Sequence, residues 1–400
     1  MNAKQAKYPQ LRFPGFTDAW EQRKLGDILK EFTTKSKTEN EHRILSSTNS
    51  GMEFRDGRVS GASNLGYKII KNGDLVLSPQ NLWLGNININ NIGTGLVSPS
   101  YKTFHFINID SSFINPQLRT QKMLEEYKNS STQGASVVRR NLELDSFYQI
   151  KMFVPTISEQ IKIGSFFEQL DHLITLHQRK LAKLKELKQG YLQKMFPKNG
   201  SKFPQLRFAG FAGAWEQRKL GEIVEFYSGL TYSPDNVQEK GTFVLRSSNV
   251  RNGEIVDADN VYVSHDVVNS SNVQKGDIIV VVRNGSRDLI GKHGQIKHQM
   301  GNTVIGAFMT GIRSETPDFT NAMLDTQQFA IEINKNLGAT INQITTGSFK
   351  KMAFVVPINV EERNAVGAFF RNIDDLITLH QRKLEKLQEL KKGYLQKMFC

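Results

Sequence analysis

The chain has 400 residues, of which 38 % are hydrophobic and 23 % charged, so it has the length of two or three domains and the composition of a folded protein. Fifty-two Lys and Arg against 39 Asp and Glu give a net charge of +13, which favours a polyanionic partner, nucleic acid first, over a merely basic protein. Cys400 is the only cysteine, which excludes a disulfide framework and a cysteine metal cluster within one chain.

The chain shows no sign of membrane insertion or export. No apolar run approaches the length of a membrane span, and the first residues lack the apolar segment of a secretion signal. We therefore expect a cytoplasmic protein with no membrane partner.

The first element along the chain is a motif that occurs twice, which we call the opening motif. Residues 9–28 return at 204–223 with four differences. The shared aromatic residues could pack against the segment that follows or stack on bases. Because the motif recurs before unlike segments, we favour the packing role. These aromatics are Phe13, Phe16 and Trp20 in the first copy and Phe208, Phe211 and Trp215 in the second.

A body follows each opening motif, at about 29–154 and 224–356. Short β-rich runs such as Asp74–Ser78 and Asp277–Val282 alternate with Gly, Asn and Ser turns, which is typical of strands. The pattern also predicts helical patches in both bodies, at Gln117–Asn129 and Asn321–Asn336. Each body is therefore predicted to be a mixed α and β domain.

The two bodies share only fragments of sequence. A Gly-Asp pair precedes a strand in each, and a Ser-Phe pair precedes the last proline. The shared pairs are Gly73-Asp74 and Ser146-Phe147 in the first body and Gly276-Asp277 and Ser348-Phe349 in the second. The frames of the two bodies are therefore related, while their surfaces differ.

A long amphipathic segment closes each half. Asp171–Phe196 returns as Asp374–Phe399, shifted by 203, with four pairs differing. Alternating steps of four and three residues select mostly apolar positions, the heptad pattern of a coiled coil. The predicted seam consists of Leu170, Ile174, His177, Leu181, Leu184, Lys188, Tyr191 and Met195, and of Ile373, Ile377, His380, Leu384, Leu387, Lys391, Tyr394 and Met398.

Both helices are predicted to begin upstream of the repeat. Thr156–Glu159 and Asn359–Glu362 have the spacing of a capping box, each after a proline. A helix from about 157 to 196 is roughly 60 Å long.

The polar seam positions predict the direction of the two helices. In an antiparallel pair in full register His177 faces Lys391 and Lys188 faces His380, whereas a parallel pair would oppose the two lysines. We therefore expect an antiparallel intramolecular coiled coil.

The predicted architecture is α+β: two mixed α/β domains joined by two long helices, related by an approximate two-fold axis. The polar linker Pro197–Lys202 marks the midpoint. The predicted boundaries place the first body at 1–154, the first helix at 155–198, the second body at 199–356 and the second helix at 357–400.

Motifs for catalysis are missing from the sequence. It has no Gly-x-x-x-x-Gly-Lys-Ser/Thr phosphate loop, no Gly-x-Gly-x-x-Gly after a strand, no His-Glu-x-x-His and no Asn/Asp-Pro-Pro-aromatic tetrapeptide. The eight histidines do not cluster at metal-ligand spacing. We therefore expect no catalytic activity from the chain by itself.

Amide-rich and basic loops in the bodies are the candidate DNA-binding residues. Gln and Asn suit adenine, Arg suits guanine, and adjacent basic residues suit phosphates. Such loops can equally be hairpin turns or solvated surface. In the first body the candidates are Gln80, Asn81, Trp83, Asn86, Arg139, Arg140 and Asn141. In the second they are Arg246, Asn249, Arg251, Arg283, Asn284, Arg287, Lys292, His293, Lys297 and Gln299.

Two unlike bodies alternating with two near-identical helices resemble the specificity subunit of type I restriction-modification enzymes. The resemblance covers the whole chain, including the repeated Trp-Glu-Gln-Arg-Lys-Leu-Gly and Leu-Ile-Thr-Leu-His-Gln-Arg-Lys-Leu. It implies two target-recognition domains that each read half of a bipartite double-stranded DNA site. It also implies helices that act as spacer and as docking surface for two methyltransferase (modification) subunits, with ATP-dependent restriction subunits joining them.

The resemblance further implies that the chain carries no cofactor and that S-adenosylmethionine, ATP and Mg are bound by partner subunits. The sequence also allows two alternatives: a stand-alone tandem DNA-binding regulator and a scaffold that binds no DNA. DNA retention that ignores salt would count against both DNA hypotheses.

Overall fold

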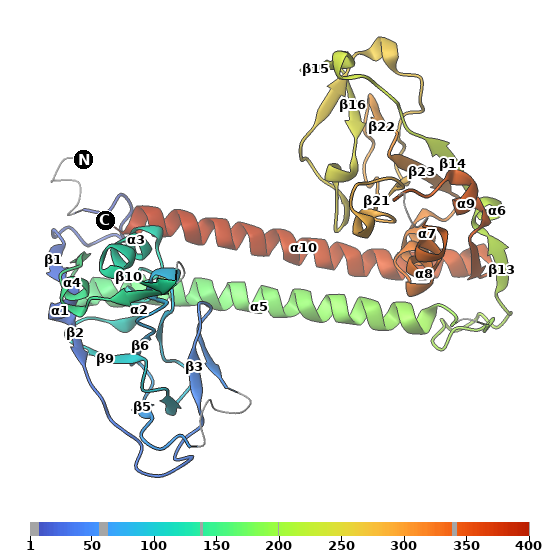
Figure 1. Ribbon diagram of the computed structural model, residues 1–400. Coiled ribbons are helices and arrows are strands. Elements are labelled where there is room, and N and C mark those ends of the chain that lie inside the picture. Colours follow the sequence, from blue (N-terminus) through green and yellow to red (C-terminus); the bar gives the residue numbers. More distant parts are fainter. Residues whose placement is uncertain (1–7, 56–62, 137–138, 199, 338–341, 400) are drawn as a thin grey trace. The chain divides into compact units, whose positions relative to one another are not determined.

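The computed structural model describes residues 8–55, 63–136, 139–198, 200–337 and 342–399, without the side chains of 134–136 and 139. Contacts divide the chain into two compact units, Met1–Gln178 with Arg382–Cys400, and Arg179–Gln381. Each unit combines one opening motif and its body with the first half of one long helix and the last half of the other (Figure 1).

The first body combines short strands with short helices and leads into its long helix. They are β1 (Glu21–Lys24), α1 (Leu25–Ile28), β2 (Leu29–Glu31), β3 (Leu45–Ser47), β4 (Met52–Phe54), β5 (Lys68–Ile70), β6 (Leu75–Leu77), η2 (Leu82–Leu84), β7 (Ile87–Ile89), β8 (Gly95–Val97), β9 (Lys102–Phe106), α2 (Ser111–Ile114), α3 (Gln121–Asn129), β10 (Ser131–Ser136), β11 (Arg139–Leu142), α4 (Leu144–Tyr148), β12 (Lys151–Val154) and α5 (Ile157–Met195).

The second body repeats this plan with additional short elements. They are β13 (Glu216–Lys219), α6 (Leu220–Ile223), β14 (Val224–Ser228), η3 (Pro234–Asn236), β15 (Val237–Gln238), β16 (Thr242–Leu245), η4 (Ser247–Asn249), β17 (Val250–Arg251), β18 (Gly253–Ile255), β19 (Val261–Val263), η5 (His265–Val267), β20 (Ile278–Val281), η6 (Arg287–Leu289), β21 (His293–Gln295), β22 (Thr303–Ile305), β23 (Met309–Ser314), α7 (Pro317–Leu324), α8 (Gln327–Asn336), α9 (Thr346–Lys351), β24 (Ala353–Val356) and α10 (Val360–Met398).

One sheet is common to the two bodies. The strand order β2-β9-β6-β7 in the first corresponds to β14-β23-β20-β21 in the second, where β18 and β17 extend the sheet. The strands predicted after the Gly-Asp pairs, β6 and β20, lie inside these sheets and are fully buried. The prediction of two mixed α and β bodies with related frames is therefore confirmed.

The opening motifs close the cores, as the packing prediction expected. Trp20 is 2 % exposed and lies edge-on against Phe113 and Phe399, while Trp215 is 1 % exposed and lies edge-on against Phe196 and Phe319. In each unit the phenylalanine directly after one long helix thus packs beside the tryptophan that precedes the body.

The long helices α5 and α10 have 39 residues each, which corresponds to about 58 Å and to the predicted length. Within the first unit Phe166 packs on Tyr394 while Asp171 binds Lys391, so residue numbers rise along one helix as they fall along the other. Lys188 with Asp374 and Tyr191 with Phe369 give the same direction in the second unit. The antiparallel direction is therefore confirmed within each unit.

The coiled coil is shifted from the full register in which lysine would face histidine. Lys391 binds Asp171 and Lys188 binds Asp374, each six residues before the histidine that was expected opposite the lysine. A carboxylate neutralises the ammonium group, whereas an imidazole only accepts a hydrogen bond, so the aspartate pairing is the more favourable one. Every predicted seam residue is nevertheless buried or half-buried.

The predicted helix starts are correct, but the capping-box glutamates have another role. The Asn359 carboxamide accepts hydrogen bonds from the backbone N–H groups of Glu361 and Glu362, at 2.7 and 3.3 Å. The Glu362 carboxylate instead accepts two hydrogen bonds from the Arg207 guanidinium, at 2.7 and 2.8 Å. The Glu159 carboxylate accepts two hydrogen bonds from Arg12 in the same way. These bidentate pairs tie each opening motif to the first turn of its helix.

Over the described residues, none of the helices is long and apolar enough to cross a membrane.

Candidate nucleic-acid interface

In the first body the structure brings together candidates that lie 60 residues apart. The loop after β6 carries Gln80 and Asn81, and the backbone N–H of Arg140 on β11 donates to the Gln80 carbonyl at 3.4 Å. Gln80 and Asn141 are exposed, and Asn81 is half-buried. We call Gln80, Asn81, Arg140 and Asn141 the first reader surface. The side chain of Arg139 lies outside the described part of the chain.

Three first-body candidates are engaged within the protein. The Asn86 carboxamide is 8 % exposed, accepts from the Ser47 hydroxyl at 2.6 Å and donates to the Ser47 carbonyl at 2.9 Å. Trp83 is half-buried and packs against the core. The Arg140 guanidinium donates to the carbonyls of Ser131 and Lys128, at 2.9 and 3.4 Å. Asn86 is therefore unsuited to DNA contact, because its bonding capacity is used internally.

In the second body the loop after β20 is held in a fixed shape. The backbone N–H groups of Val282 and Arg283 both donate to the Phe308 carbonyl, at 3.0 and 3.2 Å. Asn284 donates from its side chain to the Ser247 hydroxyl at 3.1 Å and accepts from the backbone N–H of Ser286 at 3.0 Å. The Ser247 contact brings the 246–251 loop beside this loop.

A basic surface results, which we call the second reader surface: Arg251, Arg283, Asn284, Arg287 and Lys292. Arg251, Arg283 and Arg287 are exposed. Burial, and then the nearby charge of Arg251, lower the pKa of Lys292. Like charges held this close favour a polyanion such as the DNA backbone.

Two candidates from the 246–251 loop serve the loop itself. Asn249 is 0 % exposed, and its amide group donates to the Ala258 carbonyl at 2.6 Å. Arg246 binds the Asp259 carboxylate at 2.5 Å. The prediction that Asn249 contacts DNA does not fit this burial. Gln299 is exposed in the segment before β22.

His293 and Lys297 are both engaged by acidic residues. The His293 ring lies 3.4 Å from the Asp325 carboxylate and 3.1 Å from the Gly291 carbonyl. Lys297 binds Glu254 at 3.1 Å and Asp375 of α10 at 2.9 Å. These acidic partners make both side chains less available to DNA than the exposed candidates, and Lys297 ties the body to α10.

Lys188 is the centre of this anchor. Its ammonium lies 2.6 Å from Asp325 of the body and 2.6 Å from Asp374 of α10. Burial by itself lowers the pKa of Lys188, but the two carboxylates outweigh this effect and raise the pKa overall. Burial opposes ionisation of Asp325, but His293 and Lys188 lower its pKa to about 2. A seam lysine thereby joins both helices to the second body.

The sequence patterns missed three residues beside the second reader surface. Phe308 is 53 % exposed in the turn before β23, and the Arg283 guanidinium lies 5.0 Å from its ring centre. Asn342 accepts from the Asn284 backbone N–H, and Gln343 pairs with Arg283 as an isolated bridge. Asn342 lies six residues before Ser348, and Arg140 lies six residues before Ser146. The shared Ser-Phe pair therefore could have indicated that Asn342 occupies the position equivalent to Arg140.

A second exposed stack was also missed, in the first body. The Arg43 guanidinium lies 3.8 Å from the ring centre of Phe54, which is 40 % exposed on the β3–β4 hairpin. Neither residue belongs to a repeated fragment, so no spacing signal marked them.

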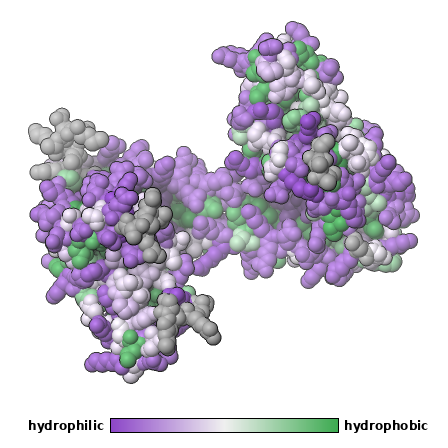
Figure 2. Space-filling model, in the orientation of Figure 1, coloured by the Kyte–Doolittle hydropathy of each residue, from purple (hydrophilic) through white to green (hydrophobic). Residues whose placement is uncertain are grey.

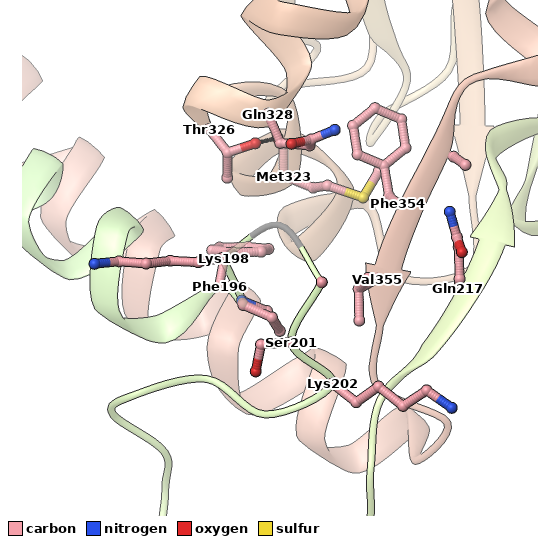
Figure 3. Close-up of a pocket in the computed structure, with 13 residues that line it drawn as sticks. Phe196, Lys198, Ser201, Lys202, Gln217, Met323, Thr326, Gln328, Phe354 and Val355 are labelled. Carbon is pink, nitrogen blue, oxygen red and sulfur yellow. Dashed lines mark hydrogen bonds between the residues drawn. The ribbon is translucent and has the colours of Figure 1, made fainter.

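A cavity of about 200 Å³ lies beside the end of α5 (Figure 3). Phe196, Met323 and Phe354 line it, and the side chains of Lys198 and Lys202 extend away from it. Among the described residues, moreover, no group of three or more His, Cys, Asp or Glu could hold a metal ion. We assign this cavity no chemistry.

Comparison with known proteins places the chain in a family. The profile of the type I restriction modification DNA specificity domain matches residues 17–186 and again 213–389. The chain is 24 % identical over 287 residues to the type I restriction enzyme MjaVIII specificity subunit of Methanocaldococcus jannaschii, covering 68 % of this chain and 66 % of that one. It is 21 % identical over 193 residues to the StySPI specificity subunit of Salmonella potsdam, covering 46 % of this chain and 41 % of that one.

The fold agrees with that family. The S subunit of a type I restriction-modification system from M. genitalium superposes with a TM-score of 0.69 at 14 % identity, covering 98 % of this chain and 99 % of that one. The two profile matches each span one body with most of its long helix, and together they take in most of the chain. The chain therefore belongs to the family of DNA specificity subunits of type I restriction-modification systems.

Proposed function

We propose that each body reads one half of a bipartite double-stranded DNA site. The observation that carries this proposal is that one frame presents different side chains at the same place. After β6 the first reader surface offers Gln80 and Asn81, and after β20 the second offers Arg283 and Asn284. Amides suit adenine and arginine suits guanine, so two bodies on one frame would read two different sequences.

The long helices act as the spacer between the two half-sites and as the docking surface for two methyltransferase subunits. Each helix leaves three leucines at repeated positions 36 to 46 % exposed: Leu173, Leu176 and Leu187 on α5, and Leu376, Leu379 and Leu390 on α10. Residues 3 and 14 apart fall near one face of a helix. Figure 2 shows such hydrophobic patches along the otherwise hydrophilic helices, and exposed apolar patches of this kind mark interaction sites.

The chain specifies the site and carries no catalytic step. S-adenosylmethionine belongs to the methyltransferase subunits, and ATP with Mg to restriction subunits that join the complex in the cytoplasm. In this division of labour residues 1–154 and 199–356 are the target-recognition domains, and 155–198 and 357–400 are the spacer helices. The family membership and the two unlike reader surfaces support these roles.

Exchange of one body tests the proposal. Residues 29–154 would be replaced by the body of another family member, the chain would be assembled with its methyltransferase subunits, and methylated sites would be mapped. We expect one half-site to change and the other to persist, because the two cores are separate. Exchange of 224–356 is the matched control and should change the opposite half-site. If a well-folded chimera changed both half-sites, independent recognition would be refuted.

A further inference from the structure

Phe308 is an exposed aromatic residue on a rigid turn. Phe308 is 53 % exposed, although hydrogen bonds hold the backbone of the turn in place. The Met309 backbone N–H donates to Gly306 at 2.9 Å, and the Phe308 carbonyl accepts from both Val282 and Arg283. The ring therefore offers an exposed face, in a fixed position, on which another planar group can stack.

The Arg283 guanidinium lies over this ring, 5.0 Å from its centre. Arg313 over Tyr227, at 4.6 Å, is a structural stack for comparison. Arg313 donates to Asp277 at 3.1 Å and to the Asn272 carbonyl at 2.9 Å, so its donors are used within the core. The hydrogen bonds among the described residues use no side-chain donor of Arg283, which is exposed.

A stacked guanidinium is prepared for base recognition. Contact with an aromatic face fixes the plane of the group while its N–H donors remain free at the edge. Two such donors in one plane match O6 and N7 of guanine in the major groove, and prior ordering reduces the entropy lost on binding.

We propose that Arg283, held in orientation by Phe308, reads a guanine in the second half-site. Phe308 is the positioning residue, and Arg251 and Lys292 supply phosphate contacts that carry no sequence information. The inference rests on the proposed function of the second body. It adds the base that is read and the residue that orients the reading side chain.

The test uses the complex with its methyltransferase subunits and a panel of DNA sites in which each base pair of both half-sites is changed in turn. Arg283→Lys keeps the charge but loses the planar pair of donors. We expect it to reduce discrimination at one G·C pair of the second half-site by roughly tenfold or more, with the first half-site unchanged. Phe308→Leu should reduce discrimination at the same pair, and Phe308→Tyr should retain it.

Matched controls separate base recognition from charge. Lys292→Gln should weaken binding to all sites alike and lower the salt dependence, as loss of a phosphate contact does. If Arg283→Lys weakened all sites alike, or if Phe308→Leu left discrimination intact, the inference would be overturned. Failure of the proposed function would appear elsewhere, as a second half-site that does not change when residues 224–356 are exchanged.

Discussion

At the residue scale, the buried charges of the second unit are held together as one group. The His293 ring faces two acceptors, the Asp325 carboxylate and the Gly291 carbonyl, which together favour its doubly protonated form. Burial by itself lowers the pKa of His293, but the hydrogen bond and the charge of Asp325 raise it above 6.5. Lys188 then completes the neutralisation of Asp325.

This group predicts a pH dependence of stability in two directions. The pKa of Asp325 falls from 3.8 to about 2 on folding, so its contribution is present above 3.8 and is lost as the pH falls toward 2. A shift of this size corresponds to about 2 kcal/mol. The raised pKa of His293 acts in the opposite direction. The stability that His293 contributes is fully present below pH 6.5 and is lost as the pH rises through the pKa of the folded state. Stability should therefore decline on both sides of the interval from about 4 to 6.5.

Denaturant unfolding followed at several pH values checks this prediction. His293→Gln should abolish the decline contributed above pH 6.5, while His298→Gln, which changes an exposed histidine of the same body, should preserve it. An unchanged pH profile in His293→Gln would show that the ring does not gain a proton on folding.

At the scale of elements, glycine decides how closely a body approaches its long helix. A Cβ at Gly367 of α10 would lie 2.5 Å from the Phe319 backbone nitrogen, and one at Gly164 of α5 would lie 2.8 Å from that of Phe113. The two glycines are 203 residues apart, the period of the repeat. Both therefore permit the same contact between a long helix and the short helix, α2 or α7, that follows the sheet.

Gly367→Ala should destabilise the protein by about 1 to 3 kcal/mol, because the backbone of α7 would have to move. Gly190→Ala on α5 is the matched control, since its Cβ would meet nothing within 4 Å. The control should stabilise the protein by up to about 1 kcal/mol through helix propensity. Free energies of unfolding measure both effects, and equal effects of the two substitutions would contradict the close approach.

At the scale of the whole molecule, each unit is closed by a carboxylate on the first turn of a long helix. Glu362 is 2 % exposed and binds Arg207 twice, as Glu159 binds Arg12. Trp215 adds an indole N–H bond to Glu362 at 3.1 Å. In each unit, one such ion pair therefore joins the opening motif to the first turn of its long helix.

Arg207→Met should destabilise the second unit by about 3 to 5 kcal/mol, because Glu362 would remain buried without its cation. Adding Glu362→Gln should restore part of the loss, since the amide oxygen can still accept from Trp215. Arg218→Met removes an exposed pair with Glu216 and should change the free energy of unfolding by less than about 1 kcal/mol. If Arg207→Met had as small an effect as Arg218→Met, the pair would not hold the unit closed.

The sequence by itself determined the two long helices, their ends and the two related bodies. These features follow from local periodicity and from repetition, which are visible without knowing any contact. It also placed Gln80 and Arg283 on exposed loops after buried strands.

Only the tertiary structure decided which polar residues face solvent. Asn249 and Gln80 are both amide residues that the sequence marked as candidates for DNA binding. Asn249 is nevertheless 0 % exposed, whereas Gln80 is exposed. Lys188 was assigned to the seam, but its partners Asp325 and Asp374 come from two elements far away in the chain. The physical reason is that burial of a polar group depends on which distant segment covers it and supplies its hydrogen bonds, and no local pattern contains that information.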